Sequence, residues 1–290
     1  MKTYLSVAVM GWLLAFTVFA APGSGGSADD VARELANPNT SLASLNFKLQ
    51  YRAFDGDLPS ANDQDATTLI FQPSLPFALE NGDKVLFRPA IPIHLSSPVA
   101  QFGRAAQPVF RGASIDFDDE SGLGDIAFDL AYARTTPGGL LLAGGMIASL
   151  PTASNDDLGT DRWTLGPELL IGKITRKSVL GMFPNHQWDI GGSGETDISL
   201  TSSQMFAIYL PEGGWNVGSS PIITYDHISD QWTIPLNFSF GKTVVLGGRP
   251  WKFGMELNYY VEQADAFGPD WFVGISVAPV TKNFLAEWFK

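Results

Sequence analysis

The sequence predicts an all-β protein, an antiparallel up-and-down transmembrane β-barrel of about 12 strands that follows an N-terminal signal peptide. One observation is a two-residue periodicity between Ser44 and Thr281. In the segment Leu45–Arg52, apolar residues occupy the odd positions and polar residues the even ones. Successive side chains of a strand point to opposite faces, so this segment has one apolar and one polar face. The other observations are an apolar leader and connections that alternate between short and long.

The leader comes first in the chain. Lys2 supplies a positive start, Leu5–Phe19 is apolar, and the residues up to Ala20 resemble a small-residue cleavage site. A transmembrane anchor is the alternative, but a basic stop-transfer flank does not follow. Elsewhere the sequence lacks the ~18 consecutive apolar residues of a membrane helix. We therefore expect export to the bacterial outer membrane, which the chain would cross with strands.

The chain divides into four expected parts. Residues 1–20 are the signal peptide and 21–43 a flexible periplasmic segment, in which Asp29–Ala36 could form one or two helical turns ended by Asn37-Pro38. Residues 44–281 are the barrel and 282–290 a C-terminal tail. The expected strands are 44–54, 66–78, 84–96, 123–134, 140–150, 162–173, 179–190, 197–210, 214–226, 231–243, 251–262 and 269–280.

The connections support a membrane barrel with both termini in the periplasm. Short turns such as Glu80–Asp83 alternate with longer, more acidic connections such as Ser97–Gly122. A soluble β-sandwich also alternates, but its strands are usually shorter. It would also not place aromatic residues at so many strand ends, as membrane barrels do. The tryptophans near predicted strand ends are Trp163, Trp188, Trp215, Trp232, Trp251 and Trp271.

Composition restricts the partners. The net charge is −12, and removal of Lys2 with the leader takes it to about −13, which argues against nucleic acid because phosphate binding needs clustered cations. Cysteine is absent, so the chain uses neither disulfides nor thiol chemistry. We expect no cofactor and no metal. The expected partners are membrane lipids, lipopolysaccharide, small-molecule solutes and the outer-membrane assembly machinery.

If the residues at the apolar positions of each strand face lipid, the residues at the alternate positions line the lumen. Tyr132, Trp188 and Tyr259 have lipid-facing parity. Cations and carboxylates facing each other across a lumen would produce a transverse field that sorts small polar solutes, or would pair and plug the barrel. The residues with inward parity are Lys48, Gln50, Arg52, Gln72, Arg88, His94, Asp125, Asp129, Glu168, Asn237, Glu256, Asn258 and Glu262.

Four apolar residues occupy predicted inward-facing positions, which are otherwise mostly polar: Ile70, Leu86, Phe183 and Phe272. They could form an apolar binding patch inside the barrel. An error of one residue in the strand assignments would give the same pattern.

Acidic residues of the long connections predict an acidic external rim. Clustered carboxylates could hold a divalent cation, but the spacing differs from a calcium-binding loop, which favours a solvated rim. Such a rim would raise the local concentration of cations. Its residues are Asp116, Asp118, Asp119, Glu120, Asp156, Asp157 and Asp161.

Catalysis is the competing function, because some barrels are lipid hydrolases that pair a serine with a histidine. His94 and Ser96 lie two residues apart on one strand face. His186 shares the lipid-facing parity of Trp188, and a serine nucleophile elbow is not evident nearby. We therefore expect that the protein is not an enzyme.

The order and spacing of several short motifs resemble one family. They are Asn37-Pro38, Gln72-Pro73, Pro76-Phe77, Gly122-Leu-Gly-Asp125, Leu150-Pro-Thr-Ala153, Leu158-Gly-Thr160, Gly166-Pro167, Asn185-His186, Pro235-Leu236 and Pro269-Asp-Trp271. Together they resemble the bacterial outer-membrane proteins grouped as the meta-pathway phenol-degradation family, often mislabelled neuromedin U. The resemblance covers nearly all of the mature chain.

The resemblance implies a porin-like barrel for passive uptake of hydrophobic or aromatic compounds. Two features depart from the family: the tail after the last strand, and Glu168 where a small or apolar residue is expected. We therefore expect an outer-membrane channel for small solutes. The alternatives are a non-conducting surface barrel and, third, a lipid hydrolase.

Overall fold

The computed structural model describes residues 27–101, 116–283 and 285–286. The expected signal peptide, residues 1–20, lies outside the described residues. The helical elements are α1 (Ala28–Ala36), η1 (Ala61–Asp63) and η2 (Asp156–Leu158). The strands are β1 (Ala43–Asp55), β2 (Asp65–Ala78), β3 (Lys84–Gln101), β4 (Asp116–Leu123), β5 (Ile126–Thr135), β6 (Leu140–Leu150), β7 (Arg162–Ile174), β8 (Ser178–Gly192), β9 (Ser199–Tyr209), β10 (Trp215–Ser219), β11 (Ile222–Asp226), β12 (Gln231–Leu246), β13 (Arg249–Glu262) and β14 (Gly268–Thr281).

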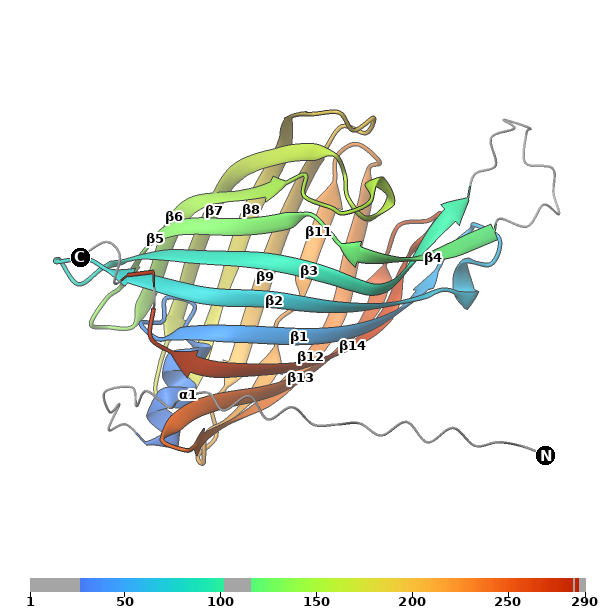
Figure 1. Cartoon of the computed structure of the whole chain (residues 1–290). Helices are drawn as coiled ribbons and strands as arrows, with labels where there is room; N and C mark the ends of the chain where they lie inside the picture. Colours follow the sequence, from blue (N-terminus) through green and yellow to red (C-terminus); the bar gives the residue numbers. More distant parts are fainter. Residues whose placement is uncertain (1–26, 102–115, 284, 287–290) are drawn as a thin grey trace, which may run out of the picture.

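The strands form a closed antiparallel barrel (Figure 1). Pairing runs through consecutive strands, and β1 pairs with β14 to complete the ring. The short strands β10 and β11 lie end to end between β9 and β12, so they occupy one strand position. The strand β4 pairs with β3 outside the ring. Among the described residues, this makes twelve strand positions, which confirms the predicted fold class.

The alternation that predicted the strands is visible in their burial. In β7, Thr164, Glu168 and Leu170 are buried, whereas the intervening Leu165 and Leu169 are exposed. An exposed apolar belt on a closed sheet is the surface that a bilayer requires. The large exposed aromatic residues of the outer face include Trp163, Trp188, Trp215, Trp232 and Trp271, and with them Tyr132 and Tyr259.

The prediction that Ser97–Gly122 is a loop is wrong at both ends. β3 continues to Gln101, and β4 pairs back along it from Asp116 to Leu123. This hairpin extends beyond the ring in Figure 1. A hydrophobicity pattern does not detect this hairpin, because its side chains are acidic and a strand exposed to water needs no apolar face.

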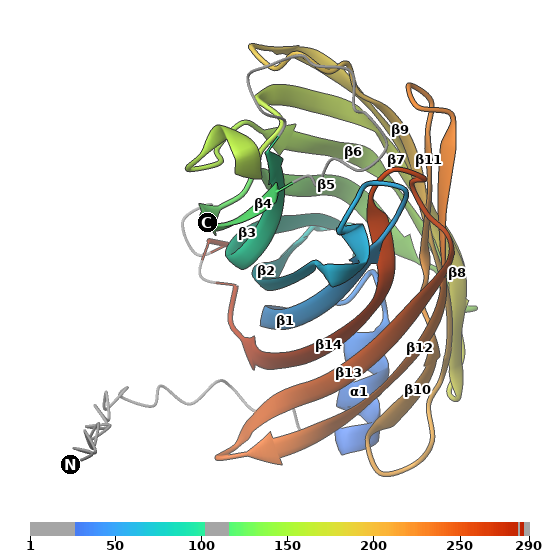
Figure 2. The ribbon, with the colours of Figure 1, turned by 90° about the vertical axis from the view of Figure 1, so that its right-hand side faces the viewer.

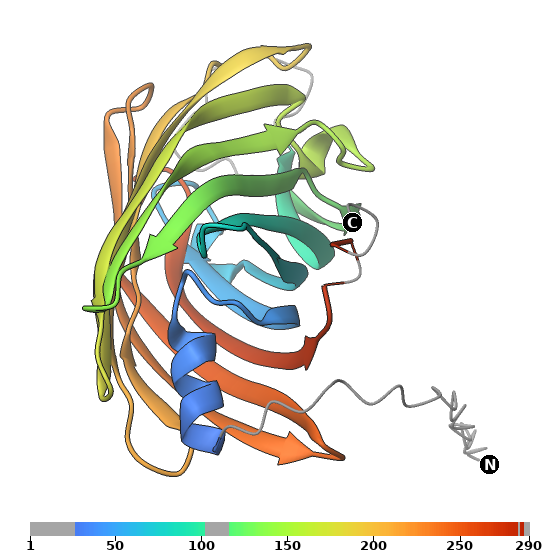
Figure 3. The same cartoon turned by 90° about the vertical axis from the view of Figure 1, so that its left-hand side faces the viewer.

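The described part of the segment before the barrel contains a helix, where one or two helical turns were expected over Asp29–Ala36. In α1, a reciprocal capping box between Ser27 and Asp30 satisfies the first amides, and the helix ends at Asn37. Figures 2 and 3 show α1 inside the ring of strands, at the end of the barrel opposite β4. Asn39 is almost fully buried, and its side-chain amide donates to the backbone oxygens of Arg134 and Leu142 at 3.0 and 3.2 Å.

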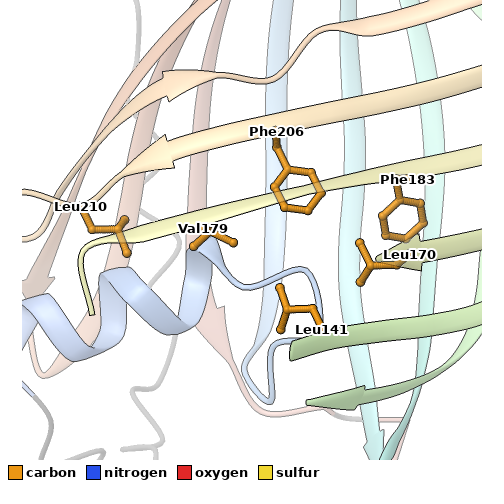
Figure 4. Close-up of a cluster of buried hydrophobic side chains, with 6 residues drawn as sticks. All are labelled: Leu141, Leu170, Val179, Phe183, Phe206 and Leu210. Carbon is orange, nitrogen blue, oxygen red and sulfur yellow. The ribbon is translucent and has the colours of Figure 1, made fainter. Parts of the chain in front are cut away.

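An apolar cluster lies where this segment meets the inner wall. It combines inward side chains of β6 to β9 with Leu210 just beyond β9, and Ala36 of α1 packs against it. Figure 4 shows these side chains projecting towards the helix region; they are Leu141, Leu170, Val179, Phe183, Phe206 and Leu210. The helix therefore covers an apolar part of the lumen near its own end of the barrel. None of the described helices is both long and apolar enough to cross a bilayer.

Candidate functional site: the lumen

The barrel encloses a cavity of about 440 Å³. One end is closed in by the segment from Leu35 to Thr40, and the rest is lined by inward side chains of the strands. Several predicted lumen residues contribute to its lining, namely Lys48, Gln72, Arg88 and Glu256. They come from β1, β2, β3 and β13, so two-residue periodicity brings together residues that are distant in the chain.

Arg88 forms the centre of a charged cluster within the lumen. Its Nε lies 2.8 Å from Asp129 Oδ2 on β5, and its Nη2 lies 3.9 Å from Glu168 Oε1 on β7. The guanidinium also lies over the ring of Phe183 on β8, 4.8 Å from its centroid. The arginine on β3 therefore contacts three other strands and narrows the lumen. Glu168 is 4 % exposed, and charges of both signs meet at this constriction.

A second group of charges lies on β1 and β13. Gln50 Nε2 donates to Glu256 Oε1 at 3.5 Å, and Lys48 lines the same cavity as Glu256. Arg52 stacks on Phe272 of β14 at 5.6 Å. The two groups place cationic and anionic side chains on different parts of the wall.

The apolar residues with inward parity also lie in the interior. Leu86, Phe183 and Phe272 are each less than 10 % exposed. Ile70 pairs with Lys48 across β1 and β2 and shares its face. Phe183 belongs to the apolar cluster, whereas Phe272 packs beside Tyr260 and Arg52. They therefore lie in separate places and do not form a single patch.

Asp125 is a correction to the predicted lumen set. It lies between β4 and β5, and its carboxylate accepts hydrogen bonds from Thr152 N, Ala153 N and Thr160 N at 2.8–3.1 Å and from Thr160 Oγ1 at 3.0 Å. It therefore fixes the connection that contains η2. The sequence did not predict this role, because alternation of inward and outward side chains holds only within an unbroken strand and the chain is interrupted at Asp125.

The remaining predicted residues lie apart from the constriction. His94 makes a 3.3 Å hydrogen bond with Thr68. Asn237 and Asn258 are joined by a 3.0 Å hydrogen bond between β12 and β13. Glu262 is exposed at the end of β13, away from the cavity lining.

The acidic rim residues are spread over two structures. Asp116, Asp118, Asp119 and Glu120 lie on β4, and Asp156 and Asp157 lie in η2, with Asp161 just before β7. The Asn155 side chain links the two by donating to Glu120 at 3.1 Å. Within the described ranges, no group of three or more such side chains is arranged to hold a metal ion.

The Ser96–His94 pair required by the hydrolase alternative is not formed among the described residues. Ser96 Oγ donates to Asp119 at 3.0 Å, whereas the His94 ring bonds to Thr68. His186 lies on the outer face and shares Thr201 with His227, at 2.7 and 2.8 Å. Ser199 Oγ lies 3.5 Å from His186 Nε2, a serine–histidine contact on the outer face and away from the lumen cavity.

A lysine and the N-terminal segment are among the contributors to the lumen that were absent from the sequence prediction. Lys252 lines the cavity, and its parity with Glu256 and Asn258 on β13 would have identified it. The contribution of Leu35–Thr40 could not be recognised, because a short amphipathic helix does not reveal whether it lies inside a barrel.

A single carboxylate joins the turn before β3 to β5 at the end of the barrel that holds α1. Asp83, in the turn before β3, accepts hydrogen bonds from Tyr132 and from Arg134 Nε and Nη2, the latter two at 2.6–3.0 Å. The Arg134 hydrogen bonds, followed by that of Tyr132, lower the pKa of Asp83 to about 2. Next to it, Lys84 Nζ donates to Asn39 O at 2.8 Å, so this corner also anchors the N-terminal segment.

Comparison with known proteins supports the fold. The COG4313 outer membrane channel from Pseudomonas putida F1 is 14 % identical, with 83 % of this chain and 95 % of that chain aligned and a TM-score of 0.60. The NanC porin is 9 % identical over 82 % of this chain and 99 % of that one, at 0.48. Outer membrane phospholipase A from Escherichia coli is 10 % identical over 89 % and 99 %, at 0.44.

No family model matches the sequence, and no curated protein matches it. The 0.60 score shows that the chain has the fold of a bacterial outer-membrane channel barrel. At this identity the likeness concerns the fold, and the two lower scores carry no further weight.

Proposed function

We propose that this protein is a passive outer-membrane channel for small solutes, inserted in the bacterial outer membrane after export through a cleaved signal peptide. The observation that carries the proposal is the cavity of about 440 Å³ inside a closed barrel, lined by charged groups of both signs. Such a lining is typical of an aqueous pathway. Lipids, lipopolysaccharide and the assembly machinery are the proposed partners of its outer surface and biogenesis.

The Arg88 cluster would act as the selective constriction. One cation faces two carboxylates, Asp129 and Glu168, at 2.8 and 3.9 Å. A permeating ion must pass this local field, and a polar solute can exchange its hydration for these side chains. The acidic residues of β4 and η2 would enrich cations at the mouth.

The volume and lining of the cavity favour a narrower class of solutes than the fold alone implies. A cavity of about 440 Å³ lies in the range of small-molecule sites, which is roughly 300–1,000 Å³. Phe183 and Phe206 line it together with polar groups, a combination that suits a small aromatic solute. The family resemblance favours the same cargo.

Planar-bilayer recording of the purified, refolded protein tests the proposal. We expect discrete conductance steps, a preference for cations, and block by small aromatic solutes. Arg88→Gln should strengthen the cation preference, because it removes the cation that faces two carboxylates. Arg176→Gln makes the same chemical change at an exposed turn and serves as the matched control.

Two outcomes would contradict parts of the proposal. Unchanged ion selectivity in Arg88→Gln would contradict the proposal that the Arg88 cluster is the selective constriction. Unchanged cation preference after Asp118→Asn with Asp119→Asn would contradict the proposal that the acidic rim enriches cations. Complete lack of conductance would favour a non-conducting barrel, the alternative that the position of α1 supports.

A further inference from the structure

Small residues form part of the inner wall on β12, β13 and β14. Gly241 of β12 pairs with Gly254 of β13, which in turn pairs with Ser276 of β14. Gly274 and Ala278 lie on the same face of β14, two positions to either side of Ser276. All but Gly241 line the lumen cavity. We call these five residues the lumen recess, because a wall of small side chains leaves room for part of a solute.

Two lysines border the lumen recess. Lys48 of β1 pairs with Ser276, and Lys252 of β13 pairs with Ala278. Among the residues that the structure describes, neither ammonium group has a carboxylate oxygen within 4.0 Å. Charged groups that leave bulk water without a partner are destabilising, and a bound anion would offset that cost.

The lining of the lumen cavity contains more cations than carboxylates. Within the described ranges, its single carboxylate is Glu256, beside the cations Lys48, Arg88 and Lys252. Arg88 is already paired with the two carboxylates of its cluster. Glu256 attracts Lys48, whereas the charge that acts on Lys252 is the like charge of Lys48. Lys252 is therefore the cation for which an anion from outside the chain is most favourable.

A buried amide points to a ligand at the same place. Asn216 of β10 pairs with Gly241, lines the lumen cavity and is 8 % exposed. Its carboxamide lies across Gly241, where a Cβ would stand 2.9 Å from Nδ2, so it extends from β10 towards the lumen recess. Nδ2 has no hydrogen-bond partner among the described residues. A buried donor of this kind is destabilising until an acceptor reaches it.

The positions of these donors suit a carboxylate. Lys252 lies two strands from Asn216 and two strands from Lys48, which is about 10 Å along the wall in each direction. The inner wall is concave, so the long lysine side chains and the amide converge over the lumen recess. A carboxylate accepts several hydrogen bonds at once, and those from charged donors are the stronger ones.

An apolar wall adjoins the lumen recess on the side of Asn216. Ile208 of β9 pairs with Gly218 of β10, two positions from Asn216, and Phe206 follows on the same strand face. Both line the lumen cavity, and Phe206 belongs to the apolar cluster (Figure 4). A solute with its charged group at Lys252 can therefore place an apolar body against β9.

We propose that the lumen recess binds the carboxylate of a small solute whose single aromatic ring lies against Phe206 and Ile208. The proposal rests on the proposed channel function and deepens it, because it names the class of solute. Lys252 binds the carboxylate, Asn216 donates a hydrogen bond to it, and Lys48 adds a second positive charge. The acidic strand β4 lies at the end of the barrel opposite α1 (Figures 2 and 3), so enrichment of cations there is a separate property.

Direct binding to the purified, refolded protein tests the lumen recess independently of conduction. Isothermal titration calorimetry in detergent micelles would compare benzoate with benzyl alcohol, which has the same ring without the charge, and with inorganic phosphate, which has charge without a ring. We expect benzoate to bind about tenfold more tightly than either. Equal affinities for benzoate and phosphate, or for benzoate and benzyl alcohol, would overturn the assigned class of solute.

Lys252→Gln should weaken benzoate binding about tenfold, because it removes a charged hydrogen-bond donor, and should leave the binding of benzyl alcohol unchanged. Lys242→Gln is the matched control. It makes the same chemical change on the neighbouring strand β12, where the ammonium group lies 4.4 Å from the centroid of the Trp215 ring on the outer face. Its affinity for benzoate should equal that of the unmodified protein.

Two further variants cover the case in which Lys252→Gln does not fold. Lys252→Arg keeps the charge and should retain most of the affinity for benzoate, whereas Asn216→Leu keeps the approximate size and should lose several-fold. Heat-dependent migration on a denaturing gel would confirm folding of each variant. Affinity for benzoate that is unchanged in folded Lys252→Gln or in folded Asn216→Leu would overturn the role of that residue.

Planar-bilayer recording of the same preparation separates this inference from the channel function. Conductance steps without benzoate binding would overturn the lumen recess and leave the channel intact. Benzoate binding without conductance would overturn the channel and leave the lumen recess as a binding site. Absence of both would overturn both proposals.

Discussion

The regular strand structure is interrupted at two places, Gly124–Asp125 and an interval that we call the wall window, where residues 219–223 are not paired with residues 234–238. Side chains fill the two places differently. At the first, Asp125 accepts three backbone amides and one hydroxyl from the connection after β6. Gly124 N also donates to Pro92 O at 3.0 Å, which continues the attachment to β3. At the second, Asn237 accepts one backbone amide and donates to one neighbouring side chain.

The difference shows that the number of hydrogen bonds a side chain can accept decides how much structure it holds across a strand break. A carboxylate can accept several hydrogen bonds at once, and charged acceptors form stronger ones than neutral amides. The Asp125 break therefore carries a folded connection over it. At the wall window, backbone groups stay unpaired beside an outer groove of about 340 Å³ lined by Leu236 and Phe238, and the carboxamide of Asn237 spans the interval.

Removing the carboxylate should have the largest effect. Asp125→Ala deletes four hydrogen bonds, and we expect the connection from Thr152 to Thr160 to lose about 3 kcal/mol of local stability. Its open population should then rise roughly a hundredfold. A protease specific for acidic residues should cleave at Asp156 or Asp157 correspondingly faster.

Asp118→Ala is the control for this experiment, because it removes a carboxylate from an exposed position of the nearby β4. Its cleavage rate should match that of the unmodified protein. Equal rates for the two variants would mean that Asp125 does not hold the connection.

Removing the carboxamide should have a smaller effect on stability. Asn237→Ala deletes two hydrogen bonds and should cost about 1–2 kcal/mol. The midpoint of thermal unfolding, measured by tryptophan fluorescence in detergent micelles, should therefore fall by a few degrees. Ser239→Ala, on the same strand face beside the wall window, removes only a 3.3 Å bond to Gly218 O. A similar fall in the thermal midpoint of both variants would show that Asn237 has no special role.

The comparison also shows which features the sequence predicts. Two-residue periodicity identifies the strand positions and the inward side of Lys48 and Glu256, because burial on one face fixes the register. It fails at Asp125, where the strand is interrupted, and at Asp116–Glu120, where a strand in water needs no apolar face. The expected single strand over 214–226 contains Pro221, which marks its interruption in the observed structure.

The wall window and the inner helix need information about partners that the chain alone does not provide. Pro235 indicates a lost donor, but its consequence depends on Ile222 being opposite, which follows from the register of β11. Likewise, the helix 28–36 can be anticipated from its sequence, whereas its burial depends on the space left between β6–β9 and β13. The sequence therefore could not predict these features, because they depend on contacts between residues that are distant in the chain.

Asp83 provides the mildest test, because it is a second carboxylate that joins elements and, unlike Asp125, it faces a cation. Its pKa of about 2 is below the ordinary 3.8, so its stabilising effect is complete above about pH 4 and disappears as the pH falls through about 2. We expect Asp83→Asn to lower the thermal midpoint by a few degrees at pH 7, measured by tryptophan fluorescence in detergent micelles. The difference from the unmodified protein should shrink between pH 4 and 2.

Arg134, the main partner of Asp83, is about half exposed, and exposed ion pairs contribute little. The effect should therefore be smaller than that of Asp125→Ala, whose carboxylate is bound by neutral amides that water would otherwise have to satisfy. Asp57→Asn, at an exposed position in the connection between β1 and η1, controls for loss of charge. A difference from the unmodified protein that persists unchanged at pH 2 would mean that Asp83 acts through the shape of its turn and not through its charge.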